Sequence, residues 1–273
     1  MALKYGFSIR GIFASIFRLF MEFPTDVPGL FDTGQTRNTV ASWRSLLSTS
    51  DFPPQCPLIR MVLYKATTDK EHEFVLFYFH HWKLAEPATA VLVVDRTVDL
   101  DSLESAENNG SAAHVTRSSG IISPSASQIP AHDSVVTMQN KTSIVSAFLK
   151  HRYGSYNQLL TLEFPATSAP PSATEISVLL SAIAQHAPNY HLYQTQCFWF
   201  ASTIWEAVKQ LFPDCHETTQ NDGRSRYLGL KVGVTDSVND VCREYRSEWT
   251  HIQNEAEQKM QAECDRAQRV SPS

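Results

Sequence analysis

The chain has 273 residues, of which 42% are hydrophobic and 19% charged, a composition typical of a globular protein with one large domain or two small ones. A formal net charge of -5 and a pI near 6.0, without any lysine- or arginine-rich block, give no electrostatic basis for binding nucleic acid. The five cysteines are widely spaced and include no Cys-x-x-Cys pair, which argues against a disulfide framework or a zinc ribbon. A reducing, intracellular compartment is predicted, most simply the cytoplasm.

Residues 1–21 are apolar and basic, with no acid. Arg18 interrupts the apolar run, which is therefore too short for a membrane-spanning helix and poor as the core of a signal peptide. We favour a helix that covers the body of the protein, while a mitochondrial targeting sequence and an amphipathic helix in contact with a membrane stay open. The whole of 1–57 is predicted to be a helical and irregular N-terminal segment, with helical spacing over 39–48.

Three strands are predicted next, over 58–66, 72–79 and 88–94, because these stretches are rich in β-branched and aromatic residues. The second is a near-continuous apolar run, which indicates a strand buried on both faces. Residues 99–134 are rich in Ser, Asn and Ala and lack a period, so we expect a mobile insertion there. A short helical patch at 144–149 and a strand at 159–164 follow.

Helical patterns dominate the last hundred residues. Ser172-Ala-Thr-Glu175 is a capping-box pattern before an apolar run that Pro188 ends. A second apolar helix begins at Cys197 and ends near Phe212. The sequence therefore predicts an α+β fold, with a small antiparallel sheet packed on helices in a core over 58–235.

A long C-terminal amphipathic helix is predicted within 236–273, spanning about nine turns over 236–268. Its apolar residues form one stripe with steps of three and four that average near 3.6, and they are Val238, Val241, Tyr245, Trp249, Ile252, Ala256 and Met260. The stripe can dock on the body, bind a protein partner or mediate self-association, and the sequence does not choose between these.

Cys197 opens its helix at the first turn, after a polar stretch. Unpaired backbone N–H groups and the helix dipole favour a thiolate at that place, as a nucleophilic cysteine requires. The alternative is a small apolar core residue, because unpaired cysteines are often buried.

A cysteine nucleophile needs a base nearby, and His72 stands at the entry of the most apolar strand. If 72–79 and 88–95 pair as a hairpin, His72 faces Asp95 or Arg96, and a carboxylate there would orient the imidazole. The alternative is that His72 only caps the strand while Asp95 pairs with Arg96 at the surface. His80, His81 and His191 are weaker choices for the base.

The order of these features resembles the circularly permuted papain-like fold, shared by lecithin:retinol acyltransferase-like proteins and PPPDE-type cysteine peptidases. Their cysteine segment commonly reads Asn-Cys-x-His-Phe, whereas this chain has Gln196-Cys-Phe-Trp-Phe-Ala201. The stretches His72-Glu-Phe-Val-Leu, Leu-Val-Val-Asp-Arg96 and Cys-Phe-Trp-Phe-Ala201 are also similar to a large group of fungal proteins of uncharacterised function.

The resemblance implies a cysteine hydrolase or acyltransferase that acts on an amide, peptide or acyl-ester bond. Cys197 would be the nucleophile and His72 the base, with Asp95 orienting it. The Cys197 N–H, with the amide of Gln196 or Gln194, would support the oxyanion, and no metal or organic cofactor is implied. The alternative function is a catalytically silent interaction module of the same fold.

Overall fold

A computed structural model of the chain describes residues 27–31, 34–50, 53–67, 71–81, 88–98, 129–190, 196–221, 226–227, 230–231 and 237–270. The strands are β1 (Thr36–Thr39), β2 (Leu58–Ala66), β3 (Glu73–His81), β4 (Ala88–Val98), β5 (Ile129–Gln139), β6 (Tyr156–Glu163), β7 (Asn189–Tyr190), β8 (His216–Thr219), β9 (Arg226–Tyr227) and β10 (Leu230–Lys231). The helices are α2 (Val40–Leu47), the short 3-10 turn η1 (Pro53–Gln55), α4 (Thr142–Tyr153), α5 (Ala173–His186), α6 (Cys197–Leu211) and α7 (Ser237–Val270).

The centre of the molecule is an antiparallel sheet of eight strands. Seven of them follow the order β1-β5-β4-β3-β2-β6-β8, and β7 pairs with β5. Neighbouring strands along this order pair antiparallel, from β1 with β5 at one end to β6 with β8 at the other. The expectation of an α+β fold with an antiparallel sheet and a long C-terminal helix is therefore confirmed.

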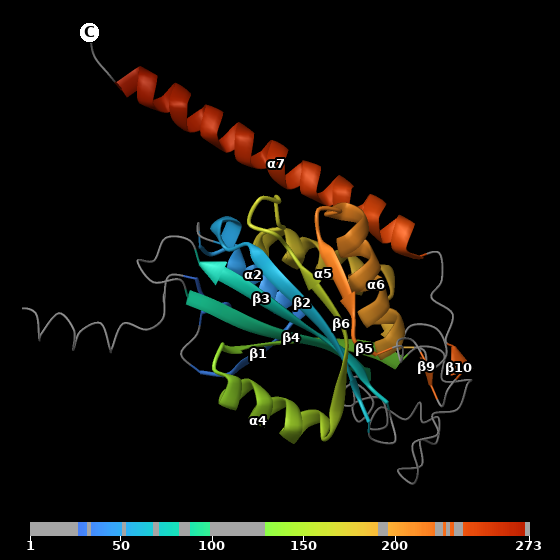
Figure 1. The fold of residues 1–273 in the computed structure, drawn as a ribbon. Coiled ribbons are helices and arrows are strands. Elements are labelled where there is room, and N and C mark those ends of the chain that lie inside the picture. Colours follow the sequence, from blue (N-terminus) through green and yellow to red (C-terminus); the bar gives the residue numbers. More distant parts are fainter. Residues whose placement is uncertain are drawn as a thin grey trace, which may run out of the picture.

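Helices cover both faces of the sheet (Figure 1). On one face α2, α5 and α6 pack over the larger core, and on the other α4 covers a smaller one. Because side chains alternate along a strand, Val75 and Phe77 of β3 enter the larger core and Phe74 and Leu76 the smaller one. The predicted burial of this strand on both faces is confirmed.

Helix α5 begins with the capping box that its sequence predicts. The Ser172 hydroxyl accepts a hydrogen bond from the Glu175 N–H at 3.2 Å, and the Ser172 N–H donates to Glu175 Oε2 at 2.8 Å. The predicted apolar face is also buried, including Ile176 and Leu180. Two N–H groups at the start of the helix are therefore satisfied within the helix itself.

Replacing Ser172 with alanine should lower the free energy of unfolding by about 1 kcal/mol, because the first turn of α5 loses its side-chain acceptor. Urea unfolding at neutral pH measures the change. Ser172→Thr, which keeps a hydroxyl, is the matched control and should retain most of the stability. Equal losses in the two variants would show that packing around Ser172, rather than the cap, is what matters.

Two expectations about chain organisation need correction. Residues 129–134, expected to belong to a mobile insertion, form the first part of β5. Residues 131–134 pair with β4, and residues 129 and 130 pair with β7. The N-terminal segment is also not separate from the core, since β1 extends the sheet beside β5 and α2 packs on α5. The described residues from 27 to 57 thus belong to the same packed unit as the strands that follow.

Helix α7 docks on the body through the first half of its apolar stripe. Val241 and Tyr245 are buried in the larger core, and Trp249 and Ile252 pack against it while partly exposed. Residues 253–264 are exposed, with Met260 at 59%, and the helix runs on beyond the helices beneath it (Figure 1). Among the described residues, no helix is long and apolar enough to cross a membrane.

Candidate functional site

His72 lies at the end of the hairpin that joins β2 to β3. Its carbonyl oxygen accepts a hydrogen bond from the Ala66 N–H at 2.8 Å, which fixes its backbone directly before β3. Lys65 makes an ion pair with Glu71 at 2.9 Å across the same turn, and Glu71 has a positive φ of 44°. The turn therefore places the imidazole at the rim of the sheet, with 19% of its side chain exposed.

Asp95 reaches His72 from the neighbouring strand, although the register differs from the expected one. Val75 lies opposite Val94, and the same register carried outward puts Thr97, rather than Asp95 or Arg96, across from His72. Asp95 is the diagonal neighbour on the same face, a position from which long side chains still meet. Its Oδ2 lies 3.5 Å from His72 Nε2.

The Asp95 carboxylate is almost completely buried and surrounded by donors. It accepts hydrogen bonds from the Ser134 hydroxyl, from Arg152 Nη2 at 2.9 Å and from the Tyr153 hydroxyl at 2.9 Å. Burial alone would raise the pKa of Asp95, but the hydrogen bond and charge of His72, the charge of Arg152 and the hydrogen bond of Ser134 together hold that pKa well below its usual range. Asp95 is therefore a carboxylate at neutral pH.

Arg96 plays no part in this cluster, because it points to the opposite face of the sheet. Its guanidinium is fully buried and binds Asp133 through Nε at 2.6 Å and Nη2 at 2.7 Å. The rings of Trp199 and Phe200, from the first turn of α6, lie 5.0 and 4.7 Å from the guanidinium carbon. The alternative of a surface pair between Asp95 and Arg96 is wrong, and Arg96 helps to seat α6 on the sheet.

Cys197 is the first residue of α6, as the sequence predicts, and is 5% exposed. The preceding Gln196 is the N-cap residue and is buried, but its side chain makes no capping hydrogen bond, and the first turn contains no acidic residue. Helix α5, by contrast, closes its own N-terminus with Ser172 and Glu175. The Gln196 side chain therefore does not satisfy the backbone donors at the start of α6, and the positive end of the helix dipole lies at Cys197.

Helix α6 places Cys197 near His72. It packs on β3, with the Phe198 ring 5.1 Å from Lys65 Nζ, and the Cys197 side chain is close enough to His72 to raise its pKa. Burial would lower the pKa of His72, but negative charge on Cys197 and hydrogen bonds to Asp95 and Cys197 outweigh it and raise the pKa to about 10.

The remaining sequence candidates lie apart from this cluster or beyond the described residues. Gln194 and His191 fall in 191–195, outside the described part of the chain. His81 is buried at the other end of β3, with its ring edge-on to Phe31. Trp199 is buried, and its Nε1 donates to the Ser237 hydroxyl at 3.4 Å. It packs α6 and α7 together rather than facing the thiol.

Ser134, Arg152 and Tyr153 were not predicted as part of the site. Arg152 and Tyr153 end α4, and the Tyr153 ring stacks on that of His72 with 5.6 Å between centroids. The basic last turn of α4 is an ordinary sequence signal for a helix end and does not indicate a partner on β4. Within the described ranges, no three His, Cys, Asp or Glu side chains gather in a way that could hold a metal ion.

Comparison with known proteins gives no matching family model, curated protein or solved structure. The geometry of Cys197, His72 and Asp95 therefore carries the functional argument.

Proposed function

We propose that the protein is a cysteine hydrolase or acyltransferase with Cys197 as nucleophile, His72 as proton carrier and Asp95 as the residue that orients His72. One observation carries this proposal: the His72 imidazole lies with its Nε2 3.5 Å from the buried Asp95 carboxylate and is near Cys197, the first residue of α6. Structural ion pairs also shift pKa values, but they do not require a thiol at an uncapped helix start. An amide, peptide or acyl ester is the substrate class.

The reaction would begin from a thiolate–imidazolium pair, because a pKa of about 10 keeps His72 protonated at neutral pH. The Cys197 thiolate attacks the carbonyl carbon, so that a C–S bond forms and the carbonyl oxygen becomes an oxyanion. When this intermediate collapses, the C–N or C–O bond breaks and His72 gives its proton to the leaving amine or alcohol. The products are a free leaving group, an acyl thioester on Cys197 and a neutral His72.

The second half restores the enzyme. Neutral His72 takes a proton from water, or from an acyl acceptor in a transferase, as that oxygen or nitrogen attacks the thioester. The C–S bond breaks, the acyl product leaves, and the thiolate and imidazolium are regenerated. Asp95 accepts no proton in this scheme, since its pKa lies well below neutral; it fixes the ring and stabilises the imidazolium.

The oxyanion would be stabilised at the start of α6. The N–H of Cys197 is one donor, and the side-chain amide of the buried Gln196, which makes no capping hydrogen bond, is a second. Gln194 stays a further candidate from the sequence. Both the uncapped helix and the histidine that precedes a central strand favour a relationship with the permuted papain-like enzymes, although Gln196 and Trp199 depart from their usual residues.

The thiol chemistry predicts a measurable difference between two cysteines of the same chain. Site-resolved iodoacetamide labelling at pH 7 should modify Cys197 about tenfold faster than the exposed Cys264, because an ordinary thiol is only a few per cent thiolate at that pH. Burial of Cys197 slows the access of iodoacetamide to its sulfur. Faster labelling of Cys197 than of Cys264 would therefore have to come from activation of the thiol. His72→Gln should slow Cys197 by about tenfold and leave Cys264 unchanged.

The labelling experiment also separates the alternative function, a catalytically silent interaction module. That alternative draws support from α7, whose exposed residues 253–264 leave about a third of a long helix for a partner or a second copy of the chain. Slow labelling of Cys197 that does not respond to His72→Gln would remove the enzyme proposal and favour this module.

A reducing, intracellular compartment is the setting that we propose for this chemistry. Thiolates are the form that oxidants attack, so an activated Cys197 is best preserved where thiols are kept reduced. The mitochondrial alternative and a membrane contact depend on residues 1–21, which lie outside the described part of the chain.

A further inference from the structure

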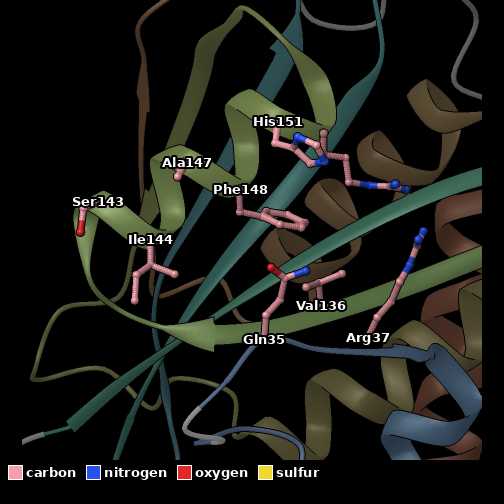
Figure 2. Close-up of a pocket in the computed structure, with 9 residues that line it drawn as sticks. Gln35, Arg37, Val136, Ser143, Ile144, Ala147, Phe148 and His151 are labelled. Carbon is pink, nitrogen blue, oxygen red and sulfur yellow. The ribbon is translucent and has the colours of Figure 1, made fainter.

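A hollow lies on the face of the sheet that α4 covers, away from α6. It has a volume of about 810 Å³ and opens between α4 and the paired strands β1 and β5 (Figure 2). Val136 of β5 lines it on one side, and Ile144 and Phe148 of α4 line it on the other. The volume falls within the usual range for small-molecule sites.

The apolar lining of this pocket includes surface that is costly to leave in water. Ile144 is 39% exposed and is one of only three large hydrophobic residues among the described residues with that degree of exposure. Phe148 is partly buried against the smaller core. An apolar group that fills the pocket would cover both side chains, and each buried CH₂ contributes about 0.8 kcal/mol.

The charged side chains that line the pocket are the arginines Arg37 and Arg152. His151 also lines it, and none of the nine described residues that line it is acidic. Arg37 enters from β1, directly opposite Val136, while His151 and Arg152 come from the last turn of α4. Cationic side chains from two separate elements therefore converge on one apolar hollow, which fits an anion and opposes a cation.

Arg152 has guanidinium surface available for such an anion. The nearest acid, Asp95, engages Nε at 3.3 Å and Nη2 at 2.9 Å. The planar guanidinium carries five N–H donors, and its Nη1 end is not used by that carboxylate. A quarter of the Arg152 side chain is exposed, so this residue borders both the pocket and the Cys197 site.

We propose that this pocket binds a small amphipathic carboxylate, such as a medium-chain fatty acid. The carboxylate pairs with Arg37 and Arg152, and the hydrocarbon tail packs on Val136, Ile144 and Phe148. A carboxylate suits this site because its two oxygens can accept two parallel hydrogen bonds from the planar guanidinium group of an arginine. Binding at this place does not depend on the reactivity of Cys197.

Isothermal titration calorimetry of the full chain at low ionic strength tests the proposal with octanoate as the probe. Saturable binding of octanoate is expected, with at least about tenfold weaker binding of acetate, which lacks the tail, and of octyltrimethylammonium, which reverses the charge. Octyl phosphate, which carries a phosphate in place of the carboxylate, tests whether the site prefers a carboxylate head group. If it binds more tightly than octanoate by about tenfold or more, the carboxylate assignment is overturned.

Two substitutions of the same residue locate the binding. Ile144→Glu and Ile144→Lys both remove the apolar side chain but differ in charge, so octanoate affinity should fall by about tenfold more in the glutamate variant. Ile144 lies in the first turn of α4, where glutamate favours the helix and lysine does not. Weak binding by Ile144→Glu therefore does not reflect a damaged helix. Equal affinity of both variants for octanoate, or no saturable binding by the unmodified chain, overturns the proposal.

Discussion

Replacing Asp133 with alanine should lower the free energy of unfolding by about 3–5 kcal/mol, because the change leaves the Arg96 guanidinium buried without its carboxylate. Arg96 is fully buried on the sheet face under α6, and both of its hydrogen bonds to Asp133 are charge-assisted. Uncompensated charge in such a place costs far more than a missing surface pair. Urea or guanidinium unfolding at pH 7 measures the loss.

A double variant separates the cost of unpaired charge from the worth of the ion pair itself. Arg96→Met together with Asp133→Leu removes both charges and fills the space with apolar side chains, so it should recover most of the stability that Asp133→Ala loses. Exposed Asp240, which pairs with Arg243 on α7, supplies the surface comparison, and its replacement by alanine should cost less than about 1 kcal/mol. If the double variant is as unstable as Asp133→Ala, the Arg96–Asp133 pair stabilises the fold in its own right.

Asp133 also illustrates why some elements of the fold can be predicted from the sequence and others cannot. Strand β3 and helix α5 are recognisable because apolar runs and a capping box are local signals. Strand β5 is not, since its first half contains Asp133 and Ser134, which resemble loop residues. Their burial depends on Arg96 and Asp95 in β4, which is distant in the sequence. Such distant partners produce no hydrophobic periodicity in the sequence of β5 itself.

The residues of the candidate site also divide into those that local sequence patterns predict and those that they do not. Cys197 and His72 were predicted from local position, one at a helix start and the other at a strand entry. The pairing of His72 with Asp95 was expected from a strand register that is wrong by one or two residues. The two side chains still meet, because diagonal neighbours on adjacent strands share a face of the sheet. The Tyr153 and Arg152 contacts to Asp95 arise only when α4 folds back across the sheet, which sequence spacing does not indicate.

Replacing Asp95 with asparagine should have a second large effect, a loss of about 3–5 kcal/mol in the free energy of unfolding at pH 7. The buried carboxylate accepts hydrogen bonds from Arg152 and Tyr153 and lies against His72, so the neutral amide leaves two cationic groups without their counter-charge. The same variant should slow iodoacetamide labelling of Cys197, because the pKa of His72 loses one of the negative charges that raise it. Under the proposed mechanism, turnover should fall by about 10³–10⁴-fold.

The pH dependence of this loss gives the sharper test, since it isolates the carboxylate charge. The folded state holds the pKa of Asp95 below its unfolded value of about 3.9, so its stabilisation is complete above that value and is lost as the pH falls through the lower, native pKa. The difference in unfolding free energy between the unmodified protein and Asp95→Asn should therefore shrink as the pH falls below about 4, where His72 is protonated in the folded and the unfolded state. Asp240→Asn, at an exposed pair, should show little change over the same range. A difference for Asp95→Asn that stays constant down to pH 3 would mean that hydrogen-bond geometry, rather than negative charge, is what Asp95 supplies to His72 and Arg152.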